Sequence, residues 1–203
     1  MNVVSAKKLL NVGGRSRHIA LPALYRGWQR VLLDIDPRGA PDIVCDARLL
    51  MRLPGGEYDA VYCSHNLEHY YRHDAFKVLA GFHHLLKDDG FVHIRVPDMA
   101  QLMRIVVDQG LDIDDFLYQS AAGPITVRDV IYGYAVEIER SGNDFFAHKT
   151  GFTEKSLRAM LSSCGFAHVH TSCTHLEIAA YAFKREPGPF ANQIPGFASA
   201  NTV

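Results

Sequence analysis

Residues 8–17 read KLLNVGGRSR, and this stretch decides how the rest of the chain is interpreted. Its apolar half, residues 9–12, predicts a short strand that runs directly into a Gly-Gly turn. A second apolar strand over residues 31–33 ends in Asp34. In parallel α/β sheets, glycines after one strand let the backbone approach a ligand, and a carboxylate at the tip of the next accepts hydrogen bonds from ribose hydroxyls. The stretch therefore predicts a nucleoside pocket.

The composition is that of an ordinary globular protein: 203 residues, 48% apolar and 21% charged, which suits one domain with a full core. The formal net charge of -1 gives no global field that would attract nucleic acid or an anionic membrane. There is no signal-peptide pattern and no apolar run near the roughly 20 residues that span a bilayer, so we expect a cytoplasmic protein. Four widely spaced cysteines form no CxxC pair, and we expect them to be reduced core residues: Cys45, Cys63, Cys164 and Cys173.

Short apolar strands and helical stretches alternate over the first half of the chain. After the first two strands we expect strands at residues 42–45, 59–63 and 91–96, and a poorly patterned helix over residues 19–28. A longer helix over residues 74–87 carries one apolar face, formed by Phe76, Leu79, Ala80, His83 and Leu86. This alternation predicts a mostly parallel sheet with helices on both faces.

Residues 98–149 break the alternation, because the stretch is too long for a simple connection in a compact sheet. It holds two helix candidates, at residues 99–109 and 127–139. We expect a helical insertion that lies as a lid over the carboxyl-terminal edge of the sheet and forms most of a substrate pocket. The reason is that loops at this edge carry the ligand chemistry in open α/β sheets.

The alternation of strands and helices resumes after the insertion. Thr153 is placed to cap the next helix, and two strands follow at residues 166–173 and 176–183. The turn between these strands is so tight that they must pair antiparallel. We expect one domain over residues 1–185 and a loose tail over residues 186–203, which is rich in Pro, Gly, Ala and Asn.

Several segments occur in a characteristic order and spacing along the chain. They are LNVGG (10–14), LLDIDP (32–37), DIVCDA (42–47), EYDAVYCSHNLEHYY (57–71), HLLKDDGFVHIRVPD (84–98) and HKTGFTEKSLRAMLSSCGF (148–166). Together they resemble the class I S-adenosylmethionine-dependent methyltransferases, in particular the small-molecule branch. The resemblance covers nearly the whole chain. It implies a Rossmann-like α/β fold with a seven-stranded, mostly parallel sheet in the order 3-2-1-4-5-7-6, in which strand 7 is antiparallel.

The resemblance also implies a set of residues that bind S-adenosylmethionine as the cofactor. The loop after the first strand would wrap the methionine part, and the acid after the second strand would hold the ribose. The residues after the third and fourth strands would contact the adenine and form the wall near the sulfonium. In this sequence those positions are Asn11, Gly13, Gly14, Asp34, Ile35, Asp46, Ala47 and Ser64. Asp36 lies close enough to Asp34 to be an alternative ribose acid.

The glycine loop departs from the family pattern, because Arg15 and Arg17 stand where later glycines are expected. Asn11 replaces the usual acid but still offers an acceptor. Arg15 carries a Cβ, so a positive φ at that position would strain the backbone by about 1 kcal/mol or more. Residues 13–18 also fail the GxGxxG pattern, which disfavours a nicotinamide site.

Two histidines are candidates for a general base in methyl transfer: His65 after the fourth strand, and His148 where the insertion returns to the sheet. We expect His148 to face the cavity and His69 to be a packed structural residue. His65, His69 and His73 recur at helical spacing, but no Cys or second acid accompanies them, so we expect no metal site. Candidates for substrate contacts, with simple packing as the alternative, are Tyr70, Tyr71, Arg128, Tyr132 and Tyr134.

The resulting hypothesis is an enzyme that transfers a methyl group from S-adenosylmethionine to an O or N atom of a small molecule, as a monomer or homodimer. Two alternatives stay open. One is a non-catalytic methyltransferase-fold protein that acts as a partner of another enzyme, and the other is a synthase that uses decarboxylated cofactor. A nucleic-acid methyltransferase is disfavoured, because SHNL at residues 64–67 stands where the (Asn/Asp)-Pro-Pro-aromatic motif of that class belongs.

Overall fold

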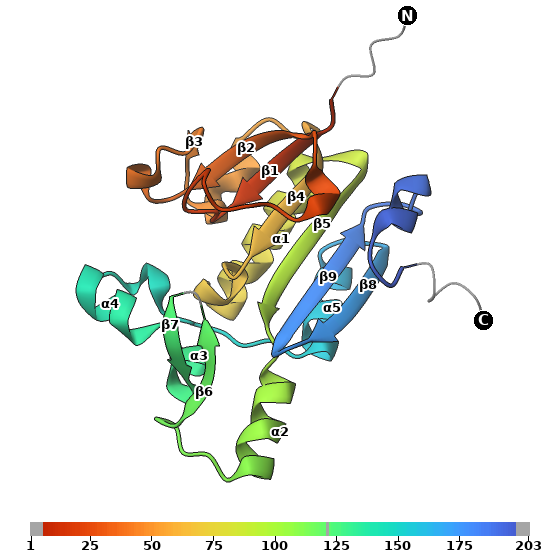
Figure 1. Cartoon of the computed structure of the whole chain (residues 1–203). Coiled ribbons are helices and arrows are strands. Elements are labelled where there is room, and N and C mark those ends of the chain that lie inside the picture. Colours follow the sequence, from red (N-terminus) through yellow and green to blue (C-terminus); the bar gives the residue numbers. More distant parts are fainter. Residues whose placement is uncertain (1–5, 121, 198–203) are drawn as a thin grey trace, which may run out of the picture.

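The computed structural model describes residues 6–120 and 122–197. Its largest element is a seven-stranded sheet in the order β3-β2-β1-β4-β5-β9-β8 (Figure 1). The strands are β1 (Lys8–Val12), β2 (Gln29–Asp34), β3 (Ile43–Val44), β4 (Tyr58–Ser64), β5 (Leu86–Pro97), β8 (His168–Thr174) and β9 (Glu177–Phe183). When β8 and β9 are counted as the sixth and seventh strands, this is the predicted 3-2-1-4-5-7-6 order. β9 is antiparallel to both of its neighbours, so the predicted topology is confirmed.

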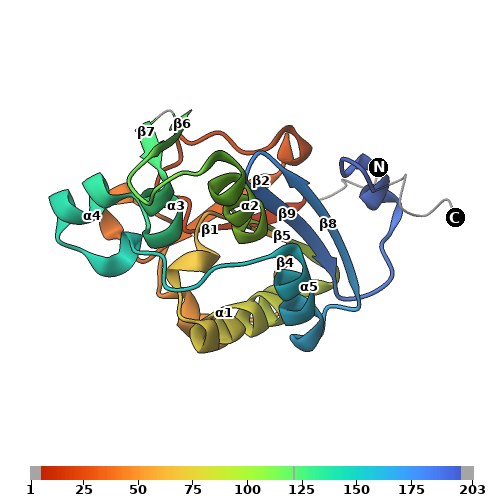
Figure 2. The ribbon, with the colours of Figure 1, turned by 90° about the horizontal axis from the view of Figure 1, so that it is seen from below.

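The two faces of the sheet carry separate cores, because side chains alternate along each strand. Leu10 and Val12 of β1 face the core that is shared with α1 (Arg72–Leu85) and α5 (Glu154–Ser163). Figure 2 shows these two helices on the same side of the sheet. Leu9 belongs to a second core on the opposite face. Thr153 caps α5 as predicted, since its hydroxyl accepts a hydrogen bond from the backbone N–H of Ser156.

The buried face of α1 is shifted by one residue from the predicted face. Its buried apolar side chains are Ala75, Val78, Leu79, Phe82 and Leu85. Phe76 is only partly buried, and Leu86 begins β5 instead of ending the helix. Between residues 75 and 86 apolar residues occupy two neighbouring stripes of the helix, so the 3.6-residue period does not by itself select which stripe faces the sheet.

The second face is covered by short 3-10 helices where α-helices were expected. The predicted helix over residues 19–28 is a single turn, η1 (Ala23–Tyr25), and the segment that contains η6 (Pro189–Gln193) packs beside it. Ala191 and Ile194 are 2% exposed. The expectation of a loose tail is therefore wrong for residues 189–197, because these residues cover an aromatic surface of β5 and β9 that would otherwise face water.

The insertion lies beyond the carboxyl ends of the parallel strands, as expected (Figure 1). It is not purely helical, because it contains an antiparallel hairpin with its own small core. Its elements are α2 (Met99–Gln109), β6 (Phe116–Ser120), β7 (Gly123–Thr126), α3 (Val127–Tyr132), α4 (Ala135–Ser141) and η5 (Asp144–Phe146). The predicted helix over residues 127–139 breaks at Gly133, which has a φ of 95° and lies so close to the Phe146 carbonyl that a Cβ would overlap it.

None of the described helices has the length and apolarity required to cross a membrane. The four cysteines are free thiols. Cys63 is buried, whereas Cys173 is exposed, so the expectation that all four are core residues is wrong for Cys173.

His93 of β5 is a buried histidine within the second core. It is 3% exposed, its Nδ1 lies 3.1 Å from the hydroxyl of Tyr25, and its ring stacks on Tyr181 with centroids 4.1 Å apart. Burial lowers the pKa of His93 to about 3, and the nearby charge of Arg95 adds to the shift. The native protein therefore keeps this imidazole neutral at pH values where the unfolded chain binds a proton.

This difference makes the stability of the fold depend on pH. Below about pH 6.5 the unfolded state binds more protons than the native state, so the free energy of unfolding falls as pH falls. Between about pH 7.5 and pH 5, we expect His93 to contribute a loss of about 2 kcal/mol. Urea unfolding of the wild type and of His93→Gln at both pH values isolates this contribution, because the other histidines titrate in both proteins. Parallel pH profiles would show that His93 is not the cause.

Candidate active site

A cavity of about 470 Å³ opens at the carboxyl ends of the parallel strands. Its floor is formed where β1, β2 and β4 end, and the region of η5 forms the facing wall. It is lined by Gly13, Arg15, Ile19, Asp34, Ile35, Asp36, Asp46, Arg48, His65, Asn66, His69, Tyr70, Tyr71, Asp74, Asp144, Phe145, Phe146 and Lys149. A cavity of this size suits a nucleoside-sized ligand.

Five of the predicted site residues line this cavity: Gly13, Asp34, Ile35, Asp46 and His65. The others lie behind the wall, at Asn11, Gly14, Ala47, Ser64 and His148, none of which is among the lining residues. Asn11 is 3% exposed, and its side-chain oxygen faces the guanidinium of Arg30 at 2.6 Å in the amide orientation that satisfies both groups.

Only glycine fits at the first position after β1. Gly13 has a φ of 69°, and a Cβ there would overlap the side chain of Asn66. A Cβ on Gly14 would overlap the side chains of Asn11 and Leu32. The two glycines therefore let this turn pack closely against Asn66, Asn11 and Leu32, and of the two only Gly13 lines the cavity.

Arg15 has a φ of 52°, the left-handed backbone conformation that the sequence analysis describes as strained for a residue with a Cβ. Its side chain reaches across the cavity mouth to Glu137 of α4 at 3.3 Å and lies over the ring of Phe146 at 5.8 Å. Arg30 fixes the loop that follows, because its guanidinium donates hydrogen bonds of 3.0 Å to the carbonyls of Ser16, Arg17 and Ile19. The loop is thus held by Arg15, which stands where the family pattern has a glycine, and by Arg30 of β2.

The strain at Arg15 is measurable with a pair of variants. Arg15→Gly and Arg15→Ala lose the same side-chain contacts, but only glycine adopts a positive φ without steric cost. We expect the glycine variant to be more stable than the alanine variant by about 0.5–1 kcal/mol, after the larger backbone entropy of glycine in the unfolded chain is included. Denaturant unfolding measures the difference, and an alanine variant of equal or greater stability would exclude a left-handed residue at this position.

Asp34 supports the loops that surround the cavity. One carboxylate oxygen accepts a hydrogen bond from the backbone N–H of Arg15 at 2.9 Å, and the other accepts from the backbone N–H of Asp36 at 3.0 Å. Asp34 is 8% exposed, whereas the carboxylate of Asp36 pairs with Arg38. Asp34 is therefore the better placed of the two acids to present a fixed carboxylate to the cavity.

Asp46 is engaged by a neighbouring cation. Its carboxylate accepts hydrogen bonds from Nε and Nη2 of Arg48 at 2.9 and 2.6 Å and also from the Arg48 backbone N–H. The hydrogen bonds from Arg48 hold the pKa of Asp46 below its usual value, although partial burial opposes the shift. The side chain lies at the predicted position, but an ion pair occupies much of its hydrogen-bonding capacity.

His65 is held as a cation between two carboxylates. Its Nε2 lies 2.8 Å from Glu177, and its Nδ1 lies 3.5 Å from Glu68. Burial alone would lower the pKa of His65, but the two carboxylates outweigh it and raise the pKa to about 9. The raised pKa favours the protonated ring at neutral pH, which argues against the predicted role of His65 as a general base, and that role stays a prediction.

The expected roles of His69 and His148 are exchanged in space. His69 lines the cavity, whereas His148 packs behind it with ring centroids 5.0 Å apart. The Nδ1 atoms of the two rings lie 3.2 Å from the carbonyl of Ala147 and 2.9 Å from that of Val130, respectively. The prediction that His148 faces the cavity is wrong, and the proposal that it acts as a base loses its geometric support. His73, the third histidine of the spaced set, lies apart beside Asp74 with its side chain 72% exposed.

The insertion contributes less of the wall than predicted. Its lining residues are Asp144, Phe145, Phe146 and Lys149, and the rest of the wall comes from the loops after the strands. Of the residues considered for substrate contacts, Tyr70 and Tyr71 line the cavity. Arg128, Tyr132 and Tyr134 do not, and the guanidinium of Arg128 pairs with Asp114 at 2.6 Å instead.

Neither a protein-family model nor a curated protein matches the sequence. Solved structures match by fold. A SAM-dependent methyltransferase from Archaeoglobus fulgidus has a TM-score of 0.56 at 16% identity, over 89% of this chain and 87% of that chain. The 1,6-didemethyltoxoflavin-N1-methyltransferase of Burkholderia thailandensis, with bound 1,6-didemethyltoxoflavin and S-adenosylhomocysteine, has a TM-score of 0.51 at 17% identity, over 89% and 72%. This chain has the fold of the class I S-adenosylmethionine-dependent methyltransferases.

This methyltransferase fold is also found in a structure described as a putative Zn-dependent alcohol dehydrogenase from Rhodobacter sphaeroides. It has a TM-score of 0.58 at 15% identity, and the match covers 91% of this chain and 86% of that chain. At identities this low the likeness establishes the fold alone, so any activity has to be argued from the site.

Several residues of the methyltransferase fold that shape the site were missed by the sequence analysis. Arg30 organises the loop after β1, Arg95 pairs with Glu177 at 2.8 Å beside His65, and Phe145 and Phe146 face the cavity. A lone arginine within an apolar strand is a weak signal for the role of Arg30. The Arg95–Glu177 pair joins two strands far apart in sequence, and no local pattern reports such a contact.

Proposed function

We propose that this protein transfers a methyl group from S-adenosylmethionine to an O or N atom of a small molecule. The observation that supports the proposal is the placement of Gly13, Asp34 and Asp46 in the wall of one cavity. The residues fit a nucleoside cofactor, because Gly13 places backbone at the cavity wall and Asp34 presents a fixed carboxylate there. Open α/β sheets bind their nucleotide ligands at this edge.

Methyl transfer from a sulfonium is an in-line displacement in which the cofactor supplies the reactive methyl group. The chain contributes position and exclusion of water. Asp34 offers the free lone pairs of a carboxylate already fixed by two backbone hydrogen bonds, and Ile35 offers an apolar side chain beside it. Arg15 and Phe146 both line the cavity, and the Arg15 guanidinium lies 5.8 Å from the ring centre of Phe146.

The remaining wall favours an apolar, planar methyl acceptor. Four aromatic side chains, Tyr70, Tyr71, Phe145 and Phe146, line this part of the cavity. Aromatic walls bind flat ligands through stacking and edge-to-face contacts. Lys149 lies 5.7 Å from the ring centre of Tyr71 and adds one cation at the rim.

A second candidate function is a non-catalytic partner protein that retains the fold. The observation that favours it is that two of the acids in the cavity wall already form ion pairs. Asp46 is paired with Arg48, and Asp36 is paired with Arg38. The strained Arg15 in the glycine loop points the same way. A protein of this kind would keep the cavity but bind the cofactor weakly or not at all.

Titration calorimetry with S-adenosylmethionine and with S-adenosylhomocysteine separates the two candidates. The proposal predicts one site with a Kd on the order of micromolar, about 8 kcal/mol of binding free energy. Decarboxylated S-adenosylmethionine serves as the third ligand, and a marked preference for it would favour a synthase. The absence of both heat and a thermal shift at about 1 mM ligand would leave the non-catalytic partner as the better account.

A further inference from the structure

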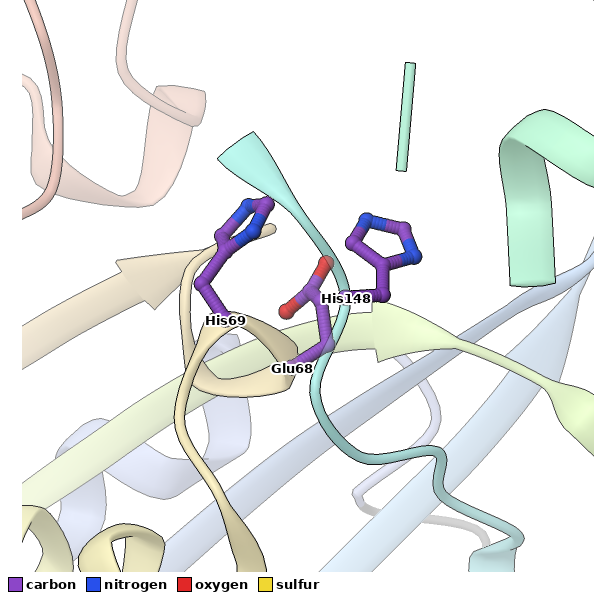
Figure 3. A group of neighbouring side chains, drawn as sticks. All are labelled: Glu68, His69 and His148. Atoms are coloured by element: carbon purple, nitrogen blue, oxygen red, sulfur yellow. The ribbon is translucent and has the colours of Figure 1, made fainter. Parts of the chain in front are cut away.

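Three side chains with metal-binding atoms converge behind the cavity wall. Glu68 and His69 come from η4 (Leu67–His69), and His148 comes from the end of the insertion. One ligand atom from each residue lies within 4.8 Å of the other two. Figure 3 shows the two imidazole rings on either side of the Glu68 carboxylate.

The hydrogen bonds of the two histidines leave the same nitrogen free on each ring. A carbonyl oxygen only accepts hydrogen bonds, so the Nδ1 atoms that face Ala147 and Val130 carry the hydrogens. In the neutral ring this leaves Nε2 with an available lone pair. A backbone carbonyl that accepts from the distal N–H is the usual way in which proteins orient a metal-binding histidine.

Glu68 supplies a carboxylate that is buried without a hydrogen-bond partner. The residue is 1% exposed, and within the described part of the chain neither carboxylate oxygen has a hydrogen-bond partner. Its nearest cation is His65, whose Nδ1 lies 3.5 Å from Oε1. A buried carboxylate costs several kcal/mol unless charge or hydrogen bonds compensate it. Oε2 has no hydrogen-bond partner among the described residues.

The backbone holds these side chains on a rigid frame. The carbonyl of Glu68 accepts hydrogen bonds from the backbone N–H groups of Lys149 and Thr150, at 2.8 and 3.2 Å. The N–H of His148 donates to the carbonyl of Tyr132 at 2.9 Å. Two segments almost 80 residues apart are thus paired at the position where their side chains meet.

We propose that Glu68, His69 and His148 form a binding site for a divalent transition-metal ion such as Zn²⁺. Two imidazoles and one carboxylate are a common ligand set for zinc and for other first-row metals with an open coordination position. Ligand atoms around tetrahedral zinc lie about 3.4 Å apart, so these side chains close by roughly 1 Å onto the ion. The sequence analysis expects no metal because it considers only nearby residues, whereas the third ligand proposed here comes from the distant insertion.

The site adjoins the cavity because His69 is one of its lining residues. An ion held by three protein ligands keeps a fourth position for water or for an oxygen of a bound molecule. The proposal concerns metal binding alone and does not depend on methyl transfer.

The test uses the full chain after treatment with a chelator and dialysis into metal-free buffer. Zn²⁺ is titrated by calorimetry in competition with a chelator of known affinity, and Co²⁺ serves as the spectroscopic probe. We expect one equivalent of Zn²⁺, and visible Co²⁺ absorption of the intensity that marks four-coordinate geometry. Mg²⁺ is expected to give no heat, because imidazole ligands do not suit it.

Glu68→Gln and His148→Gln are each expected to weaken Zn²⁺ binding by at least about 100-fold. The matched control is His73→Gln, which removes an exposed histidine from the neighbouring α1 and is expected to leave binding unchanged. If Glu68→Gln does not fold, His148→Gln decides alone, because its ring is only partly buried. Binding that survives in both ligand variants, or no binding to the wild type at about 0.1 mM Zn²⁺, overturns the proposal.

Discussion

Asp34→Ala is expected to weaken the binding of S-adenosylmethionine by about 1.5–3 kcal/mol, which is roughly 10- to 150-fold in Kd. Hydrogen bonds to a charged acceptor contribute this much when the carboxylate holds the ribose hydroxyls. The carboxylate also accepts the backbone N–H groups of Arg15 and Asp36, so the variant loses part of its loop order as well. Titration calorimetry with S-adenosylhomocysteine measures the effect without turnover.

The matched control is Asp36→Ala. Asp36 also lines the cavity, but its carboxylate is bound by the guanidinium of Arg38. We expect less than about a threefold change in Kd, in line with the small contribution of exposed ion pairs. A larger effect from Asp36→Ala than from Asp34→Ala would identify Asp36 as the ribose acid.

Phe82→Ala is expected to lower the free energy of unfolding by about 3–5 kcal/mol. Phe82 is 0% exposed, and it packs between α1 and the sheet in the larger core. Its removal leaves a cavity that the rigid sheet does not fill by relaxing. A loss of this size is a large fraction of the stability of a typical domain, so urea unfolding by circular dichroism shows it directly.

Phe76→Ala on the same helix is the control. Phe76 is only partly buried, and the guanidinium of Arg72 lies 5.1 Å from its ring centre. We expect a loss of about 1 kcal/mol, because much of this ring is already near solvent in the folded protein. Equal losses from the two substitutions would mean that the helix buries the face predicted from its sequence pattern.

These two phenylalanines also show where sequence reasoning reaches its limit for the fold. The order and direction of the strands could be predicted, because each strand is a short apolar run and the turn between β8 and β9 forces an antiparallel pair. The buried face of α1 could not be predicted, because apolar residues occupy both the predicted stripe and the stripe next to it. The hairpin of β6 and β7 was missed for a different reason: its strands are mostly exposed and lack a clear alternation.

Some residues of the candidate site could also be predicted from sequence, and others could not. Gly13 and Asp34 could be placed from sequence, because both are fixed by the ends of neighbouring parallel strands. The side-chain contacts of His65 and His148 could not be predicted from sequence. His65 contacts the carboxylate of Glu177 and His148 packs against the ring of His69, and both partners come from distant parts of the chain. The charge state of His65 follows from Glu177, 112 residues away, and no local spacing reveals that contact.

The position of β9 in the sheet has a consequence for the growing chain on the ribosome. β9 lies between β5 and β8, although it follows every other strand of the sheet in sequence. Until it emerges, β5 presents an unpaired row of backbone N–H and C=O groups, and the aromatic surface under residues 189–197 stays uncovered. Nascent chains with open strand edges and exposed apolar surface aggregate readily. A chain whose translation stops before Glu177 is therefore expected to be an aggregation-prone intermediate in which the edge of β5 is unpaired. It is not expected to form a smaller stable domain.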